Sequence, residues 1–126
     1  MAQIPPSLQD LANRFNQAQA QLQSVLLRKQ QYEAELKEVE KALSEIEKLP
    51  QEARIYKSVG NFLVPQTRDA ALQELKDRKE LLELHVKTLT KQESMLREQI
   101  EKLREEINKE LARLRGGSPE AAKGGG

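Results

Sequence analysis

Residues 54–66 read Arg-Ile-Tyr-Lys-Ser-Val-Gly-Asn-Phe-Leu-Val-Pro-Gln, and this stretch decides the fold of the chain. It lacks helical periodicity and is rich in β-branched and aromatic residues, which favour strands. A Gly-Asn pair at residues 60–61 separates two short apolar runs, and glycine at the first turn position supplies the positive φ that a tight turn needs. The stretch therefore predicts a β-hairpin in which Val59 lies opposite Phe62.

Both faces of this predicted hairpin are partly apolar. One face carries Ile55, Val59, Phe62 and Val64, and the other carries Tyr56, Leu63 and Pro65. An isolated two-stranded hairpin is marginal in water, and its open edges invite another strand. We therefore expect the hairpin to assemble with other subunits. The expected assembly residues are Ile55, Tyr56, Val59, Gly60, Phe62, Leu63 and Val64.

Heptad repeats flank the hairpin on both sides. Before it, seam residues alternate at spacings of three and four over residues 8–46, with no Gly or Pro among them. After it, the same spacing covers residues 72–107. The next seam position is Glu110, with Leu111 beside it, so the apolar pattern is expected to slip there. The repeats indicate two long helices that pack along narrow seams.

These patterns predict a mostly α fold, a long antiparallel coiled-coil hairpin with a single β-hairpin between its helices. The expected elements are a helix over about 7–49, a β-hairpin over about 54–66 and a helix over about 68–115. Ser7 and Thr67 are the predicted N-caps, and Pro50 ends the first helix. We expect a rod, formed by residues 1–115, with the hairpin at one end and both termini at the other. The Gly-rich segment 116–126 is predicted to be a disordered tail.

Composition argues against several classes of function. Charged residues make up 33% of the chain and aromatic residues 3%, which suits narrow seams better than a wide core. Basic and acidic residues number 21 and 20, and this near balance argues against nucleic acid as a partner. No apolar run approaches the roughly 20 residues of a membrane span. The N-terminus does not resemble a signal peptide, so we expect a soluble cytoplasmic protein.

No catalytic site, metal site or cofactor is predicted, and we expect no enzyme activity. The chain has no Cys, and its acidic residues are spread along helix surfaces beside basic ones. His85 is the single histidine and lies next to a seam position. It is expected to be solvated, because a metal site needs further ligands nearby.

The chain has a predicted helix, then the segment YKSVGNFLV at residues 56–64, then a second predicted helix. This arrangement resembles the β-class subunits of archaeal prefoldin. The resemblance covers about residues 4–115, and a single hairpin fits the β class because the α class has two. It implies a hexamer of two α and four β subunits whose hairpins form an intersubunit β-barrel platform. It also implies an ATP-independent chaperone, or holdase, that captures unfolded polypeptides and delivers them to a group II chaperonin.

The helix ends far from the hairpin are the second expected site. The residues expected to contact clients there are Leu8, Leu11, Phe15, Ile107, Leu111 and Leu114. These side chains either simply close the coiled coil or remain frayed and meet clients, and the resemblance favours clients. A structural scaffold or tether without chaperone activity is the alternative function. It shares the heptads but leaves an apolar hairpin with open edges unexplained.

Overall fold

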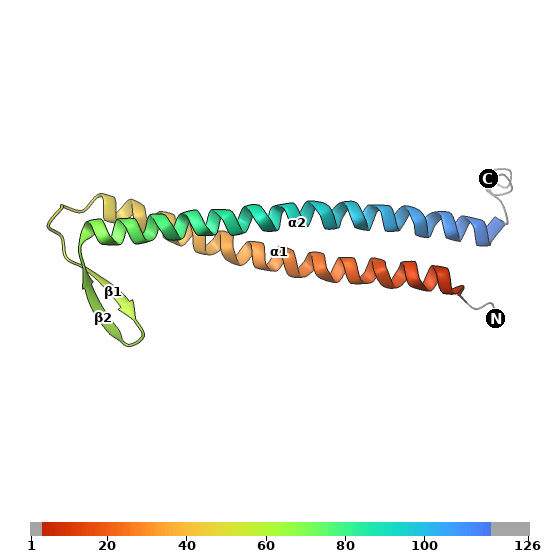
Figure 1. Ribbon diagram of the computed structural model, residues 1–126, viewed down its shortest axis with the longest axis horizontal. Coiled ribbons are helices and arrows are strands. Elements are labelled where there is room, and N and C mark those ends of the chain that lie inside the picture. The colour runs from red at the N-terminus through yellow and green to blue at the C-terminus, as the bar shows by residue number, and fades with distance from the viewer. Residues whose placement is uncertain (1–3, 117–126) are drawn as a thin grey trace. The chain divides into compact units, whose positions relative to one another are not determined.

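The computed structural model describes residues 4–116 of the 126-residue chain. Its elements follow the order α1 (Pro6–Glu47), β1 (Ile55–Val59), β2 (Phe62–Gln66) and α2 (Arg68–Gly116), as Figure 1 shows. The predicted mostly α fold, with one antiparallel hairpin between two long helices, is confirmed. Gly116 is the last residue of α2, and the rest of the predicted tail lies outside the described residues.

The chain divides into two compact units, and both helices contribute to each. The hairpin unit is Leu27–Thr90, and the terminal unit consists of the described residues up to Leu26 and from Lys91 onward. Within the hairpin unit, the end of α1 contacts the start of α2 through Arg68. Within the terminal unit, Ser7 near the start of α1 contacts Glu110 near the end of α2. In each unit the two helices therefore run antiparallel.

Each unit has its own small apolar core on the heptad seam. In the hairpin unit Val39, Leu43, Leu72 and Leu82 are buried, and Tyr32, Leu36, Ile46 and Leu75 pack against them. In the terminal unit Ala18, Ile100 and Leu103 are buried, and Leu11, Phe15 and Leu22 pack against them. All of these residues occupy the predicted seam positions, so the spacing of three and four residues located both cores.

The helix boundaries follow from local chemistry. α1 begins at Pro6 rather than at a cap on Ser7, and proline is well tolerated at a first helical position because its missing N–H would have no partner there. α1 ends at Glu47, earlier than the expected residue 49, because the Leu49 N–H turns back to the Ile46 carbonyl at 3.0 Å. α2 begins as predicted: Thr67 Oγ1 accepts the Ala70 N–H at 3.1 Å.

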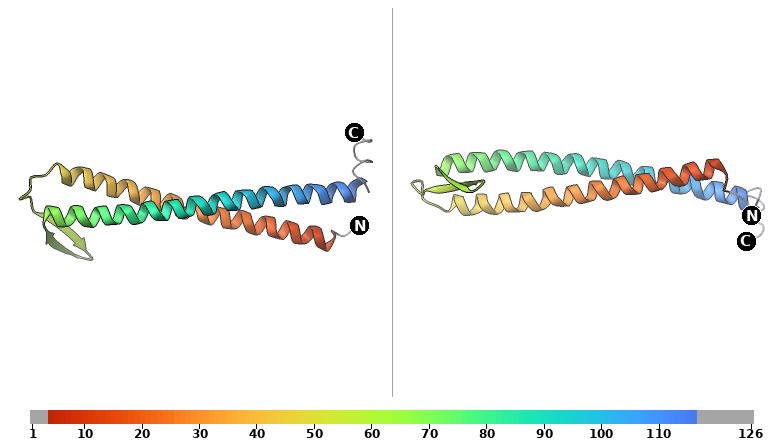
Figure 2. Two further views of the ribbon diagram at one scale, coloured as in Figure 1. Left: turned by 45° about the horizontal axis from the view of Figure 1, so that its top comes forward. Right: turned by 90° about the horizontal axis from the view of Figure 1, so that it is seen from below.

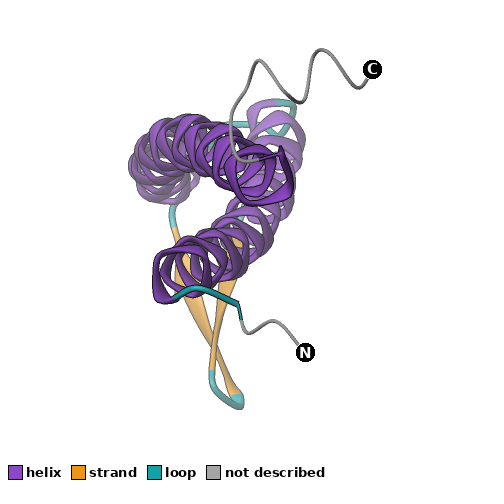
Figure 3. Cartoon of the chain, turned by 90° about the vertical axis from the view of Figure 1, so that its right-hand side faces the viewer, coloured by secondary structure: helices purple, strands orange, loops and turns teal. Residues whose placement is uncertain are grey.

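The hairpin has the register that a two-residue turn predicts. Val59 pairs with Phe62 and Ile55 with Gln66, and Figure 3 shows the two strands joined by the turn. Gly60 has a φ of 59°, and no other residue of the described chain, glycine or not, has a positive φ. A Cβ at Gly60 would meet nothing within 4 Å, so glycine is required here by the backbone conformation and not by lack of space.

The seam predicts where the chain is sensitive to loss of apolar volume. Leu82 is 0% exposed, so Leu82→Ala should lower the free energy of unfolding by about 2–5 kcal/mol. Leu84→Ala is the matched control because Leu84 lies in the same helix with 58% of its surface exposed, and it should change stability by less than about 0.5 kcal/mol. Denaturant titration followed by circular dichroism measures both. If both substitutions lower the free energy of unfolding equally, the seam is not the source of stability.

Candidate functional site

The carboxylate of Glu74 on α2 contacts both strands of the hairpin. Lys57 on β1 donates to Oε1 of Glu74, and Gln66 on β2 donates to Oε2 at 2.7 Å. Lys57 and Gln66 lie on the same face of the hairpin as Ile55, because residues two apart in a strand share a face. These hydrogen bonds, from Lys57 first and then from Gln66, hold the pKa of Glu74 below its usual range. Both strands are thus tied to α2 at one point.

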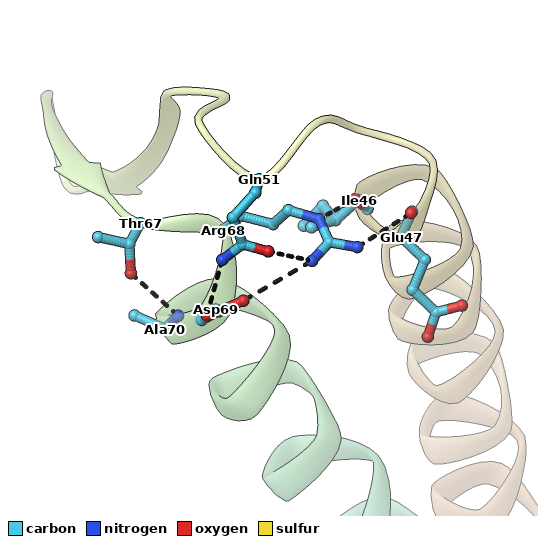
Figure 4. Close-up of polar contacts among 7 residues, drawn as sticks. All are labelled: Ile46, Glu47, Gln51, Thr67, Arg68, Asp69 and Ala70. Carbon is cyan, nitrogen blue, oxygen red and sulfur yellow. Dashed lines mark hydrogen bonds and ion pairs between the residues drawn. The ribbon is translucent and has the colours of Figure 1, made fainter.

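A second attachment joins the end of α1 to the start of α2 (Figure 4). The Arg68 guanidinium donates from Nη2 to the Glu47 carbonyl at 3.0 Å and from Nε to the Ile46 carbonyl at 3.3 Å. Gln51 supports it by accepting from Nη1 at 3.3 Å and by donating to Asp69 Oδ2 at 2.8 Å. α1 has no basic residue in its last turn, so Arg68 supplies the positive charge that its C-terminal carbonyls favour.

Most of the predicted assembly residues lie uncovered on the hairpin. Phe62 is 76% exposed and Leu63 is 71% exposed. Tyr56, Val59 and Val64 are also exposed, while Ile55 is half-buried. The turn projects away from the helices of its unit (Figures 1 and 3). The hairpin therefore presents apolar side chains on both faces next to two unpaired strand edges.

An open apolar groove adjoins this surface within the hairpin unit. It has a volume of about 480 Å³. Its apolar lining includes Ile46, Ile55, Tyr56, Leu75 and Leu81, with Lys57, Glu74 and Arg78 among its polar residues. Those polar residues already have partners, since Lys57 pairs with Glu74 and Arg78 with Glu35. The base of the hairpin and the neighbouring face of α2 thus share one groove with a mostly apolar lining.

The predicted client-contacting residues have three kinds of surroundings in the terminal unit. Leu8, Ile107 and Leu111, together with Ile4, line an open pocket of about 410 Å³. Both views of Figure 2 show the two helix ends that carry them next to each other. Leu11 and Phe15 pack against the buried terminal core, whereas Leu114 is exposed.

Glu110 occupies the seam position of α2 that lies between Ile107 and Leu114. Ser7 Oγ donates to Glu110 Oε1 at 3.4 Å, so the hydroxyl expected to cap α1 instead contacts α2. Arg113 donates to both carboxylate oxygens, with Nε 3.3 Å from Oε2. The hydrogen bond from Arg113 is the main cause that lowers the pKa of Glu110, and partial burial opposes it. Glu110 lies half-buried at the seam position, and Leu111 beside it is 37% exposed.

Other expectations concerned chemistry that needs clustered side chains. His85 is half-buried, and its ring stacks on Tyr32 with ring centroids 4.7 Å apart, a contact that the sequence did not predict. Among residues 4–116, no three His, Asp or Glu side chains lie together as metal ligands would. Within the same residues, neither helix combines the length and apolar character that crossing a membrane requires.

Comparisons with known proteins agree on one family. A family model described as prefoldin subunit matches residues 9–113. The chain is 88% identical over 125 residues to the prefoldin subunit beta of Pyrobaculum neutrophilum, which covers 99% of each chain. It is 41% identical over 111 residues to that of Pyrococcus abyssi, covering 88% of this chain and 95% of the relative. The crystal structure of the prefoldin beta subunit from Thermococcus strain KS-1 is similar with a TM-score of 0.80 and 41% identity, covering 88% of this chain and 97% of that one.

The attachment at Glu74 predicts a pH dependence. A carboxyl whose pKa is lowered in the folded state stabilises that state above its unfolded-state pKa, and the contribution is lost as pH falls through the folded-state value. The NMR titration of the Glu74 carboxyl carbon should therefore have its midpoint below the ordinary value of 4.5. Lys57→Met should raise that midpoint, because it removes the main hydrogen bond. A midpoint that the substitution leaves unchanged would contradict the attachment.

Proposed function

Because this chain belongs to the prefoldin subunit family, whose members assemble with other prefoldin subunits, we propose that it is an ATP-independent holdase subunit. The family resemblance expected from residues 56–64 is confirmed. The chaperone activity itself is our proposal. The observation that carries it is the pair of uncovered apolar surfaces, one on the hairpin and one at the helix ends of the terminal unit.

The hairpin is proposed to be the assembly surface. A two-stranded sheet has two open edges, so strands of neighbouring subunits can add to both by backbone hydrogen bonding. The exposed side chains on its two faces would then be covered by those neighbours. We propose that the neighbours are α-class and further β-class subunits in a hexamer of two α and four β, with the hairpins forming an intersubunit β-barrel platform.

The helix ends are proposed to capture unfolded polypeptides in the cytoplasm and to pass them to a group II chaperonin. Capture requires no nucleotide or cofactor, because covering apolar surface is favourable and non-directional. One half-covered leucine contributes only about 1–2 kcal/mol when a client covers it. Several subunits that hold the same client raise its effective concentration at each remaining site, so weak contacts combine into useful affinity.

Assembly is predicted to depend on the hairpin. Phe62→Asp places a charge on a side chain that has almost no cover within its own chain, so the isolated fold should keep its helicity by circular dichroism. The same charge should prevent subunit association, because burying it between subunits is costly. Leu84→Asp is the control, since it puts the same charge on another exposed apolar position of the hairpin unit. Size-exclusion chromatography with an α-class partner would contradict the proposal if the Phe62 variant assembles like the Leu84 variant.

Client capture is predicted to depend on the helix ends. The variant Leu111→Ser with Leu114→Ser removes apolar side chains that are 37% and 47% exposed, so it should spare the terminal core. Phe15 is less informative because it packs against that core. Loss of two such contacts should weaken each site roughly tenfold or more. The measurement is suppression of aggregation of an unfolded protein, without ATP, at equal hexamer concentration.

The control is Leu27→Ser with Leu84→Ser, which changes two leucines of the hairpin unit that are 57% and 58% exposed and that lie outside the groove beside the hairpin. It should leave capture unchanged, and sizing should show both variants as intact hexamers. If the control impairs capture as much as the test variant, clients contact the helix faces broadly and the helix ends have no special role. If neither variant impairs capture, the client surface lies elsewhere.

A further inference from the structure

The seam of the terminal unit opens step by step toward the end of α2. Along the heptad register Leu103 is buried, Ile107 is half-buried and Leu114 is exposed, with Glu110 between the last two. On the facing end of α1, Ile4 is 57% exposed. The loss of cover thus coincides with the point where a carboxylate replaces an apolar side chain at a seam position.

The Glu110 carboxylate is held in the seam by both helices. Its side chain is only 18% exposed, and it accepts hydrogen bonds from Ser7 of α1 and Arg113 of α2. It also lies by the first turn of α1, where free N–H groups and the helix dipole favour negative charge. α1 has no acidic residue of its own in that turn, so Glu110 supplies the missing charge. These interactions keep the carboxylate between the helices.

A carboxylate in this position prevents the last apolar layer from closing. Its oxygens need hydrogen-bond donors or water, and sealing it under leucine and isoleucine side chains would carry a desolvation cost. Ile4, Leu111 and Leu114 are therefore left partly exposed, although Ile4 and Leu111 share an open pocket with the seam residues Leu8 and Ile107. We propose that Glu110 keeps these helix ends open, so that their apolar side chains stay available to unfolded polypeptides. The availability of these side chains to unfolded polypeptides rests on the proposed holdase function, whereas the opening of the helix ends by Glu110 does not.

A second seam glutamate shows that a charge alone does not open the seam. Glu93 has a side chain 19% exposed and pairs with Arg97. The seam residue before it, Leu89, is buried, the one after it, Leu96, is half-buried, and Ile100 beyond is buried again. Cover along the seam is thus regained after Glu93, whereas after Glu110 the seam residue Leu114 is exposed. Glu93→Leu is consequently the matched control for Glu110→Leu, because it makes the same change at an internal seam position.

The test uses the hexamer assembled with an α-class partner. Glu110→Leu supplies the missing apolar layer, so amide hydrogens at the start of α1 and the end of α2 should exchange about tenfold more slowly. The concentration of hexamer needed to suppress aggregation of an unfolded protein should rise several-fold. Glu110→Gln keeps a polar group at the seam and should preserve capture. Glu93→Leu should leave both the exchange of the helix ends and capture unchanged.

The two readouts separate the possible failures. Unchanged exchange in Glu110→Leu would overturn the inference, because the seam would be no more closed than before. Slower exchange with capture equal to or stronger than that of the unsubstituted protein would overturn the link to clients. If the unsubstituted hexamer suppresses no aggregation, the proposed function fails, while the exchange measurement still decides whether Glu110 holds the ends open.

Discussion

The narrow heptad seam is the constraint on which the rest of this structure depends. Each helix buries only one stripe of side chains, and the buried apolar residues of the described chain occupy that stripe with the addition of Ala71. A stripe of this width stabilises two helices against each other, but its small cores leave most side chains of the hairpin uncovered. Every other feature must therefore be attached to the seam by individual polar contacts or be covered by another molecule.

Side chains of α2 provide those polar contacts, and two of them supply charges that the ends of α1 lack. In the hairpin unit Arg68 binds the carbonyls at the end of α1, and in the terminal unit Glu110 lies beside the start of α1. α1 has neither a basic residue in its last turn nor an acidic residue in its first, so both of its ends are complemented by charges from α2. Glu74 adds the attachment of both strands. Charge placement along α2 thus determines how the remaining parts are held.

Periodic features of the sequence predicted the periodic features of the structure. The spacing of three and four residues placed the seam, and the Gly-Asn turn with a period of two placed the register Val59 to Phe62, because regular backbones repeat side-chain directions. The contacts of Arg68, Glu74 and Glu110 were not predicted. Each joins residues distant in sequence, and α2 carries many similar charged residues whose surroundings follow no repeat. The hairpin register does show that Lys57 and Gln66 share a face, but it does not identify Glu74 as the residue they meet.

The two uncovered apolar surfaces differ in what they can bind, because their backbones differ. The hairpin combines exposed side chains such as Phe62 with unpaired N–H and C=O groups on both strand edges. Such an edge binds a partner strand with directional hydrogen bonds, and left open it is a site of aggregation. The helix ends present Leu111 and Leu114 on a helical backbone, which has unpaired groups only in its terminal turn and no row of donors and acceptors like a strand edge, so side-chain contacts dominate. Non-directional contacts of this kind accept many sequences and release them readily. Under the proposed function, the hairpin therefore suits a permanent partner and the helix ends a transient one.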